Sequence, residues 1–318
     1  MVRMTVLASG SKGNSAIVSS SKTRILVDAG LSCRELMKRM RASEEEAEKL
    51  DAILITHEHQ DHVQGLSVTA RKLGIPVYFT EATHRAWMRW MTPRKRMTYA
   101  EWLEQRRAQQ QARDAAAEAV NDEPGCEEAD AAQEEIAAAA EAPTEAKADP
   151  TALPGVEYFE AGRNFPIGDI AVTPFTIPHD AVDPVGFVFE AEGVRIGFAT
   201  DLGYMASNVS VHLRRCDVLL LESNHDLEML RDGPYPWSVK QRVMSRVGHL
   251  SNDAAADFLE KGYDGGAAYV VLAHLSESNN LPELARLSAE RALRNRMSLL
   301  ANKLMLAEQD RPMESIRL

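Results

Sequence analysis

Cysteine is scarce in this chain of 318 residues. Its three cysteines, Cys33, Cys126 and Cys216, are odd in number, far apart in sequence and without a CxxC spacing. This pattern argues against both a disulfide framework and a thiolate metal cage. We therefore expect reduced thiols.

Long apolar runs are also missing. No stretch approaches the roughly 20 residues that a membrane-spanning helix needs, and the first residues lack the apolar core and cleavage site of a signal peptide. Hydrophobic residues still make up 45% of the chain, which is enough for a sizeable core. We expect a cytoplasmic protein with no membrane partner, built on one large core.

Negative charge is concentrated in one segment. Residues 101–150 hold 14 Asp/Glu and 4 Lys/Arg, a net of −10, whereas the rest of the chain holds 33 and 32, a net of −1. Ala, Glu, Gln and Asp dominate this segment, which has too few large apolar residues for a core element. We predict a single domain over residues 1–318, interrupted at 101–152 by a low-complexity acidic insertion that is partly helical or disordered.

Short apolar runs and helical stretches alternate in the remainder, which indicates an α/β class with two packed sheets flanked by helices. Strands are predicted at 4–8, 16–18, 24–27, 52–55, 77–80, 156–160, 170–176, 185–190, 195–199, 218–222 and 268–272. Helices are predicted at 32–40, 63–73, 239–247, 252–261 and 281–302.

The central motif is IleThrHisGluHisGlnAspHis at residues 55–62, directly after an apolar strand. It places His57, His59, Asp61 and His62 on a loop that can project several donors to one point. Imidazole and carboxylate suit Zn²⁺ or Mn²⁺, and a site without cysteine leaves positions open for water, as catalysis requires. The alternative is a polar surface loop that is His-rich by chance.

This run resembles the HxHxDH motif of the metallo-β-lactamase superfamily, and the resemblance extends over nearly all of the chain outside the insertion. It is most similar to the YycJ/WalJ-type subgroup, through SerGlySerLysGlyAsnSer at 9–15, ProHisAspAla at 178–181 and HisLeuSerGluSerAsnAsn at 274–280. The resemblance implies a four-layer αββα sandwich that holds two divalent metal ions, Zn²⁺ or Mn²⁺.

The resemblance also implies a ligand set. The first metal would be held by His57, His59 and His179, the second by Asp61, His62 and His274, and Asp201 would bridge them. His179, Asp201 and His274 each follow a predicted strand, so they can lie at the same sheet edge as His57. Asp28 ends another strand near this edge, and we expect it to organise the metal loop through hydrogen bonds.

Three residues are candidates for catalysis. Asp61 would orient a metal-activated hydroxide while it remains a ligand. Glu222 and His249 resemble the glutamate and histidine that ribonuclease Z-type phosphodiesterases use to protonate the leaving group, with Glu222 keeping His249 protonated and oriented. The alternative is that His249 only lies beside a helix capped by Ser251 or Asn252, and that Glu222 pairs with an arginine.

Substrate contacts are predicted from two polar motifs. The loop at 9–15 lacks the ending of a nucleotide P-loop, but its backbone amides and short side chains suit phosphate, with Ser11 and Asn14 as candidates. The other candidates are Ser276, Asn279 and Asn280, with His225 as a further one. Residues 85–97 interleave Trp87 and Trp90 with basic residues, which fits either a nucleic-acid surface or an amphipathic helix with buried tryptophans.

The resemblance implies a DNA exonuclease that acts in the 5′ to 3′ direction, with DNA favoured over RNA and a monomer or homodimer as the assembly. Alternatives are a ribonuclease, or a hydrolase of a small phosphodiester or thioester. Only 22 positions separate His179 from Asp201, and 48 separate Asp201 from His249. These spacings leave no room for the arm of bacterial ribonuclease Z or for a β-CASP domain. A protein partner for the acidic insertion is open.

Overall fold

The computed structural model describes residues 1–92, 100, 102–104, 106–108, 110–111, 149–294 and 303–318. By contacts, the chain divides into one unit of Met1–Met91 and Pro150–Leu318 and a second of Thr92–Asp149. Those residues of 100–111 that are described are helical. Most of the predicted acidic insertion, 112–148, lies outside the described residues, so its partly helical or disordered character stays a prediction.

The first sheet has seven strands in the order β14-β1-β2-β3-β4-β5-β6. Their bounds are β1 (Arg3–Ala8), β2 (Ser15–Ser19), β3 (Arg24–Val27), β4 (Ala52–Leu54), β5 (Val77–Phe79), β6 (Val156–Tyr158) and β14 (Ile316–Arg317). β1 and β2 form an antiparallel pair, whereas β3, β4, β5 and β6 are parallel to one another. The parallel strands therefore end at one common edge.

The second sheet also has seven strands, in the order β13-β12-β11-β10-β9-β8-β7. Their bounds are β7 (Phe165–Ile167), β8 (Ile170–Thr176), β9 (Val185–Ala191), β10 (Val194–Ala199), β11 (Val218–Glu222), β12 (Tyr269–Ala273) and β13 (Lys303–Leu306). β10 to β13 are parallel, and β9 is antiparallel to both β8 and β10. β8 thus ends on the same side as β10, β11 and β12.

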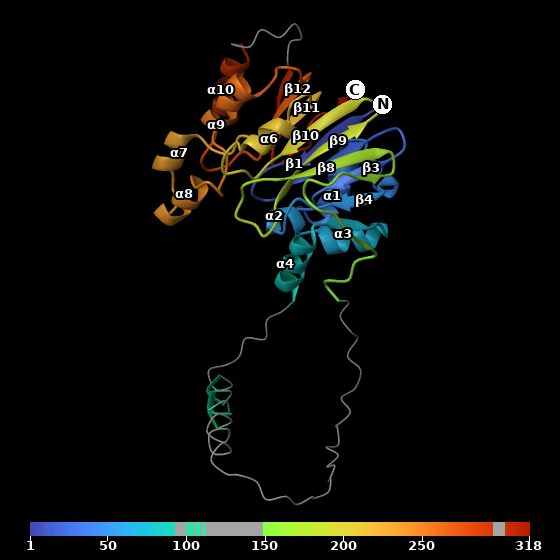
Figure 1. Ribbon diagram of the computed structural model, residues 1–318, viewed down its shortest axis with the longest axis vertical. Helices are drawn as coiled ribbons and strands as arrows, with labels where there is room; N and C mark the ends of the chain where they lie inside the picture. The colour runs from blue at the N-terminus through green and yellow to red at the C-terminus, as the bar shows by residue number, and fades with distance from the viewer. Residues whose placement is uncertain (93–99, 101, 105, 109, 112–148, 295–302) are drawn as a thin grey trace, which may run out of the picture. The chain divides into compact units, whose positions relative to one another are not determined.

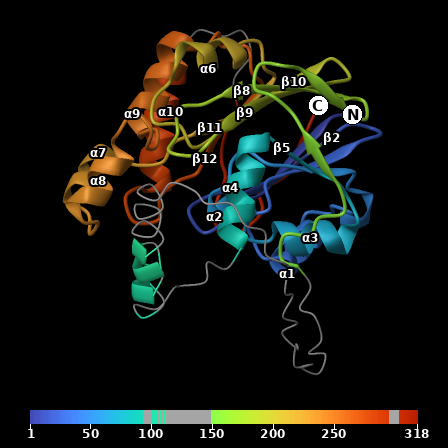
Figure 2. The ribbon, with the colours of Figure 1, turned by 60° about the horizontal axis from the view of Figure 1, so that its bottom comes forward.

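Helices cover the outer face of each sheet (Figures 1 and 2). The first sheet packs against α1 (Cys33–Ala42), α3 (Leu66–Leu73) and α4 (Glu81–Met91), and the second against α6 (Ser207–His212), α9 (Asn252–Asp257) and α10 (Pro282–Arg294). A third apolar cluster, which includes Val18, Phe187 and Val271, fills the space between the sheets. The neighbouring residues Ile17 and Val18 point to opposite faces of β2, and both are buried. Each sheet is therefore covered on both faces. The predicted four-layer αββα sandwich is confirmed.

Every predicted strand is present, with bounds that differ by at most two residues at either end. The edge strands β7, β13 and β14 were not predicted, because two to four residues are too few to show a repeating pattern of apolar and polar residues. The helix predicted at 63–73 is divided into α2 (Gln60–Val63) and α3, and the one at 252–261 continues from α9 into a π-helical turn at Phe258–Gly262. The end of the helix predicted at 281–302 lies outside the described residues.

Two further short helices, α7 (Leu227–Asp232) and α8 (Trp237–Val243), lie at the outer side of the second sheet in both views (Figures 1 and 2). The sequence predicted a helix at 239–247 in place of α8, and it did not predict α7. No helix in the part of the chain that the structure describes combines the length and apolar character needed to cross a membrane.

Candidate metal centre

The His-rich motif begins where β4 ends. A loop that includes Thr56 and His57 leads into α2. His59 precedes this one-turn helix, and Asp61 and His62 lie within it. His57 and His62 are fully buried, and their ring centroids are 4.1 Å apart. The loop therefore brings its imidazoles to one point, as the motif predicted.

Asp28 follows β3 and anchors this loop. Its carboxylate accepts hydrogen bonds from the Thr56 backbone amide (2.9 Å) and the Thr56 hydroxyl (2.8 Å), and it lies 2.8 Å from Nδ1 of His62. Because Nδ1 of His62 is engaged by Asp28, the ring presents Nε2 to the site. Asp28 thus orients His62 within this loop, and its role behind metal ligands stays a prediction.

The second sheet contributes donors from the ends of four strands. His179 follows β8, Asp201 follows β10, Glu222 ends β11 and His274 follows β12. Glu222 is fully buried, and its Oε1 accepts from Nδ1 of both His249 (2.8 Å) and His274 (2.9 Å). Its Oε2 accepts from the backbone amides of Leu202 and Leu250. Glu222 bonds histidine rather than an arginine, and Ser251 caps α9 as well.

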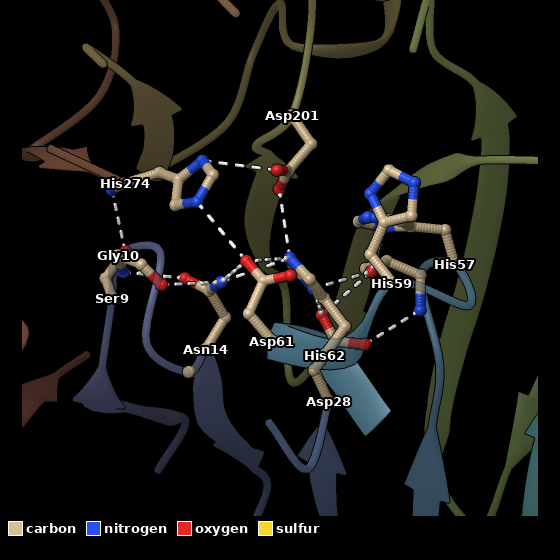
Figure 3. A network of polar contacts seen from close by, with 12 residues as sticks. Ser9, Gly10, Asn14, Asp28, His57, His59, Asp61, His62, Asp201 and His274 are labelled. Atoms are coloured by element: carbon tan, nitrogen blue, oxygen red, sulfur yellow. Dashed lines mark hydrogen bonds and ion pairs between the residues drawn. The ribbon is translucent and has the colours of Figure 1, made fainter. Parts of the chain in front are cut away.

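The donors of both sheets converge (Figure 3). Ligand atoms within 4.8 Å of one another form four overlapping groups: His57, His59 and His179; Asp61, His62 and His274; His57, His62 and Asp201; and Asp201, Glu222, His249 and His274. The first two groups match the sets predicted for two metals. Asp201 lies near both, with its carboxylate 4.0 Å from Nε2 of His179 in the first group and 3.4 Å from Nε2 of His62 in the second.

Burial and close charges shift the pKa values at this centre in opposite directions. Burial lowers the pKa of His57 well below its ordinary value. Burial would also lower that of His62, but the carboxylates of Asp201 and Asp28 outweigh it and raise the pKa. Burial opposes ionisation of Asp201, yet His274 and His62 hold its pKa well below the usual range. At this centre the carboxylates therefore favour the charged form of His62, and His274 and His62 favour the charged form of Asp201.

The described residues fit divalent cations. His57 Nε2 is buried and has no hydrogen-bond partner in the described part of the chain, and His274 Nε2 lies 3.7 Å from Asp61, beyond hydrogen-bonding distance. Unpartnered buried nitrogens are costly unless something else binds them. Imidazole nitrogens and carboxylate oxygens are a donor set suited to Zn²⁺ or Mn²⁺.

Three residues of this centre have left-handed backbone conformations. The φ angles are 59° at Asp28, 61° at Asp201 and 55° at His274. Side chains other than glycine adopt this region uncommonly, although Asp and His tolerate it better than most. In each case the turn follows a strand directly and directs the side chain into the site.

The predicted substrate residues differ in their surroundings. Ser11 is exposed in the loop before β2. Asn14 donates to Gly10 O and to Asp61 Oδ2 (3.2 Å), and it lies 3.1 Å from His62 Nε2, so it contacts two of the predicted ligands.

The candidates after β12 are engaged within the protein. Ser276 Oγ accepts from the backbone and side chain of Asn279. Asn280 is buried and bonds Asn252 and the carbonyls of Ser223 and Asn224, which leaves it no group for substrate. His225 is buried, and burial lowers its pKa to about 4.

Trp87 is fully buried beside Phe79, so for this residue the amphipathic-helix alternative for 85–97 is the right one. Trp90 is exposed on the same helix, α4. Residues 93–97 lie outside the described residues.

Sequence reasoning missed several residues of the site. The Thr56 hydroxyl lies 3.0 Å from Nδ1 of His57 as well as donating to Asp28, and its place next to the motif was the available signal. Arg242 pairs with Asp180, the neighbour of His179, and Ser9 Oγ accepts from the backbone amide of His274 at 2.7 Å. These last contacts join distant segments and have no local signature.

Comparison with known proteins agrees with this geometry. The family model described as the metallo-beta-lactamase superfamily matches residues 9–238. The chain belongs to the metallo-β-lactamase superfamily. The predicted family is confirmed, and with it the expectation of a hydrolase. Proteins of this superfamily typically bind divalent metals, and the donor groups described above are the candidates for doing so here.

Two curated members of the superfamily match most of the chain. It is 32% identical over 286 residues to Exodeoxyribonuclease WalJ of Streptococcus pneumoniae, covering 90% of this chain and 86% of that protein. It is also 32% identical over 292 residues to Exodeoxyribonuclease YycJ of Bacillus anthracis, covering 92% and 89%. The predicted resemblance to the YycJ/WalJ-type subgroup is confirmed.

Solved structures share the fold. The metallo-beta-lactamase fold protein YhfI from Bacillus subtilis has a TM-score of 0.61 at 14% identity, covering 99% of this chain and 100% of that one. Zn²⁺-bound PqqB from Methylobacterium extorquens has a TM-score of 0.58 at 16% identity, covering 98% and 99%. At these identities the likeness concerns the fold alone.

Proposed function

We propose that this protein is a dinuclear metal-dependent phosphodiesterase that acts as a DNA exonuclease from the 5′ end. The observation that carries the proposal is the pair of adjoining donor groups, one of His57, His59 and His179 and one of Asp61, His62 and His274, with Asp201 within reach of both. Two divalent cations bound there would activate water and neutralise charge on a phosphoryl oxygen.

Asp61 is the ligand placed to orient the attacking nucleophile. Its side chain is 24% exposed, whereas those of His62 and Asp201 are buried, so Asp61 faces the open side of the centre. Asn14 donates to Asp61 Oδ2 and fixes that oxygen. The other oxygen remains available to accept a proton from the nucleophile.

Glu222 and His249 are placed to protonate the leaving group. Nδ1 of His249 is bonded to Glu222, and its side chain retains 20% exposure. The buried carboxylate engages Nδ1 and fixes the ring, which leaves Nε2 to donate a proton to the leaving alkoxide. A thioester or lactam hydrolase would not need this couple, which favours a phosphodiester substrate.

DNA is proposed as the polymer because the two curated relatives carry the name exodeoxyribonuclease. The test is degradation of a 5′-phosphorylated DNA duplex, labelled at either end, by purified protein with added Mn²⁺ or Zn²⁺, beside a matching RNA. We expect early release of the 5′ label as a mononucleotide while the 3′ label stays on a shortening strand.

Asp61→Ala should reduce the rate by about 100-fold or more, as expected when a preorganised charged group is removed. Asp257→Ala, which removes an exposed carboxylate on α9, is the matched control and should retain activity. Early release of the 3′ label would reverse the proposed polarity, and cleavage of RNA alone would identify a ribonuclease. No cleavage of either polymer by metal-replete protein would reject nuclease action in favour of a small phosphodiester or acyl substrate.

A further inference from the structure

The segment that leads into His249 differs in charge from the rest of the chain. Residues 233–250 contain Lys240, Arg242 and Arg246 and no Asp or Glu, although the whole chain has a net charge of −11. The segment contains α8 and continues through the turn to His249. Lys240 is buried, whereas Arg242 and Arg246 are exposed, so two guanidinium groups lie at the surface of the segment that leads to the proposed proton donor.

The same segment exposes apolar side chains. Trp237 at the start of α8 is 62% exposed, and Met244 and Val247 are exposed after it. Burial on this helix is limited to Lys240, whose Nζ donates to the carbonyl of Arg231 in α7. Lys240 and Arg242 thus attach α8 to the rest of the protein, while its aromatic residue is exposed.

Hydrogen bonds connect this segment directly to the metal centre. The carbonyl of Gly248 lies 3.1 Å from Nδ1 of His179, and that of Val247 accepts from the amide of Asp180 at 3.0 Å. Arg242 pairs with the Asp180 side chain. The position of α8 is therefore coupled to that of a proposed ligand.

An aromatic residue and a cation also meet beside the centre. The guanidinium of Arg246 lies 4.2 Å from the ring centroid of Tyr204, which is three residues beyond Asp201 and 36% exposed. A Cβ on Gly203 would come within 2.3 Å of the Arg246 backbone, so the glycine permits this close approach. The guanidinium covers one face of the ring, so an aromatic ring and a positive charge lie together beside the centre.

We infer that Tyr204, Trp237, Arg242 and Arg246, here called the α8 surface, bind a single strand of nucleic acid beside the bond that is cut. Exposed rings stack on bases of any sequence, and guanidinium groups contact the phosphates between them. The inference rests on the proposed function for its substrate class. Asp180, which pairs with Arg242, is the carboxylate beside this surface. A protein partner would also suit exposed apolar groups, but the pairing of a ring with a cation and the absence of Asp and Glu from residues 233–250 favour a polyanion.

The test is binding of a single-stranded DNA oligonucleotide in the Asp61→Ala background, where cleavage does not interfere, followed by fluorescence anisotropy. Trp237→Ala should weaken binding by about 10- to 100-fold, as expected for loss of one base stack. Trp237→Phe should restore most of it, because a phenyl ring also stacks. Arg246→Ala should reduce the slope of log affinity against log salt by about one phosphate contact.

Tyr158→Ala is the matched control, because Tyr158 is an aromatic residue of similar exposure, 55%, on β6 at the edge of the first sheet. An equal loss in this control, or unchanged affinity in Trp237→Ala, would overturn the inference, the latter leaving the surface to a protein partner. Binding that depends on Trp237 without cleavage by the native chain would reject the proposed nuclease and retain the α8 surface. Cleavage by the native chain with a KM that Trp237→Ala leaves unchanged would retain the proposed nuclease and reject the α8 surface.

Discussion

The two sheets supply the metal centre in different ways. The first sheet contributes His57, His59, Asp61 and His62 from one loop, held by Asp28 at the end of the neighbouring strand. The second contributes donors spread over residues 179–274, and Glu222 bonds two of its histidines, His249 and His274. The first half therefore depends on local contacts, and the second on the packing of a whole sheet.

The halves meet through the apolar cluster between the sheets and through polar contacts around the metal centre. The Val185 amide donates to the carbonyl of Thr56, and the His274 amide donates to Ser9 Oγ. Damage to the second half should accordingly lower both stability and activity. Damage to the first half should change metal binding while the fold persists.

The largest expected effect is that of Glu222→Gln. The carboxylate accepts hydrogen bonds from both His249 and His274 and from two backbone amides, and a carboxamide of the same size cannot accept all of them. Breaking a buried charged network should cost about 3–5 kcal/mol of unfolding free energy, measured by urea denaturation. Glu190→Gln in the same sheet, whose exposed carboxylate pairs with Arg195, should cost about 0–1 kcal/mol. Equal midpoints for the two variants would contradict this view of the second sheet.

Asp28→Asn should act mainly on metal affinity. The amide can still hydrogen-bond Thr56, but it orients His62 Nδ1 less firmly than a carboxylate does. The affinity for the metal ion should therefore fall by about 10- to 100-fold. Competition against a chromophoric chelator measures this. The control Asp51→Asn alters an exposed carboxylate that caps the Arg24 amide beside the same strands and should leave the affinity unchanged. If Asp28→Asn unfolds the protein as readily as Glu222→Gln, the two halves do not differ as described.

The smallest effect concerns two native thiols, one against each sheet. Cys33 belongs to the cluster of the first sheet and is 8% exposed, whereas Cys216 belongs to that of the second and is 1% exposed. Burial raises the pKa of the Cys216 thiol to about 12, so at about pH 8 it stays protonated and unreactive. Iodoacetamide followed by peptide mass mapping should modify Cys216 after Cys33, and only as the second sheet opens. Faster labelling of Cys216 in the folded protein would show a looser second sheet.

Much of the first half could be predicted from the sequence. An apolar strand followed by four donors in six residues specifies a site within one loop, because a strand end and a turn suffice to place them. His179, Asp201 and His274 could be placed near it since parallel strands end at a common edge. The pairing of Glu222 with His249 was predicted through resemblance to related enzymes, and the structure places the two side chains in contact.

Contacts between distant polar residues could not be predicted. Asn14 and Asn280 both come from motifs interpreted as substrate-binding, yet Asn14 bonds Asp61 and Asn280 bonds Asn252 and backbone carbonyls. Short polar side chains satisfy buried groups as readily as they bind ligands, and sequence alone does not separate these uses. The same holds for aromatic residues: Trp87 is buried and Trp237 is exposed, because burial depends on what packs against each helix.

At Asp28, Asp201 and His274 the side chain that the metal centre needs is not the one that the left-handed backbone conformation favours. A glycine at any of them would suit the backbone better, but it would remove a carboxylate or an imidazole from the centre. Selection for activity and selection for stability therefore favour different residues at these positions. In a lineage released from the need for catalysis, glycine should accumulate there early, so a copy of this fold with such replacements would record the loss of its enzyme activity.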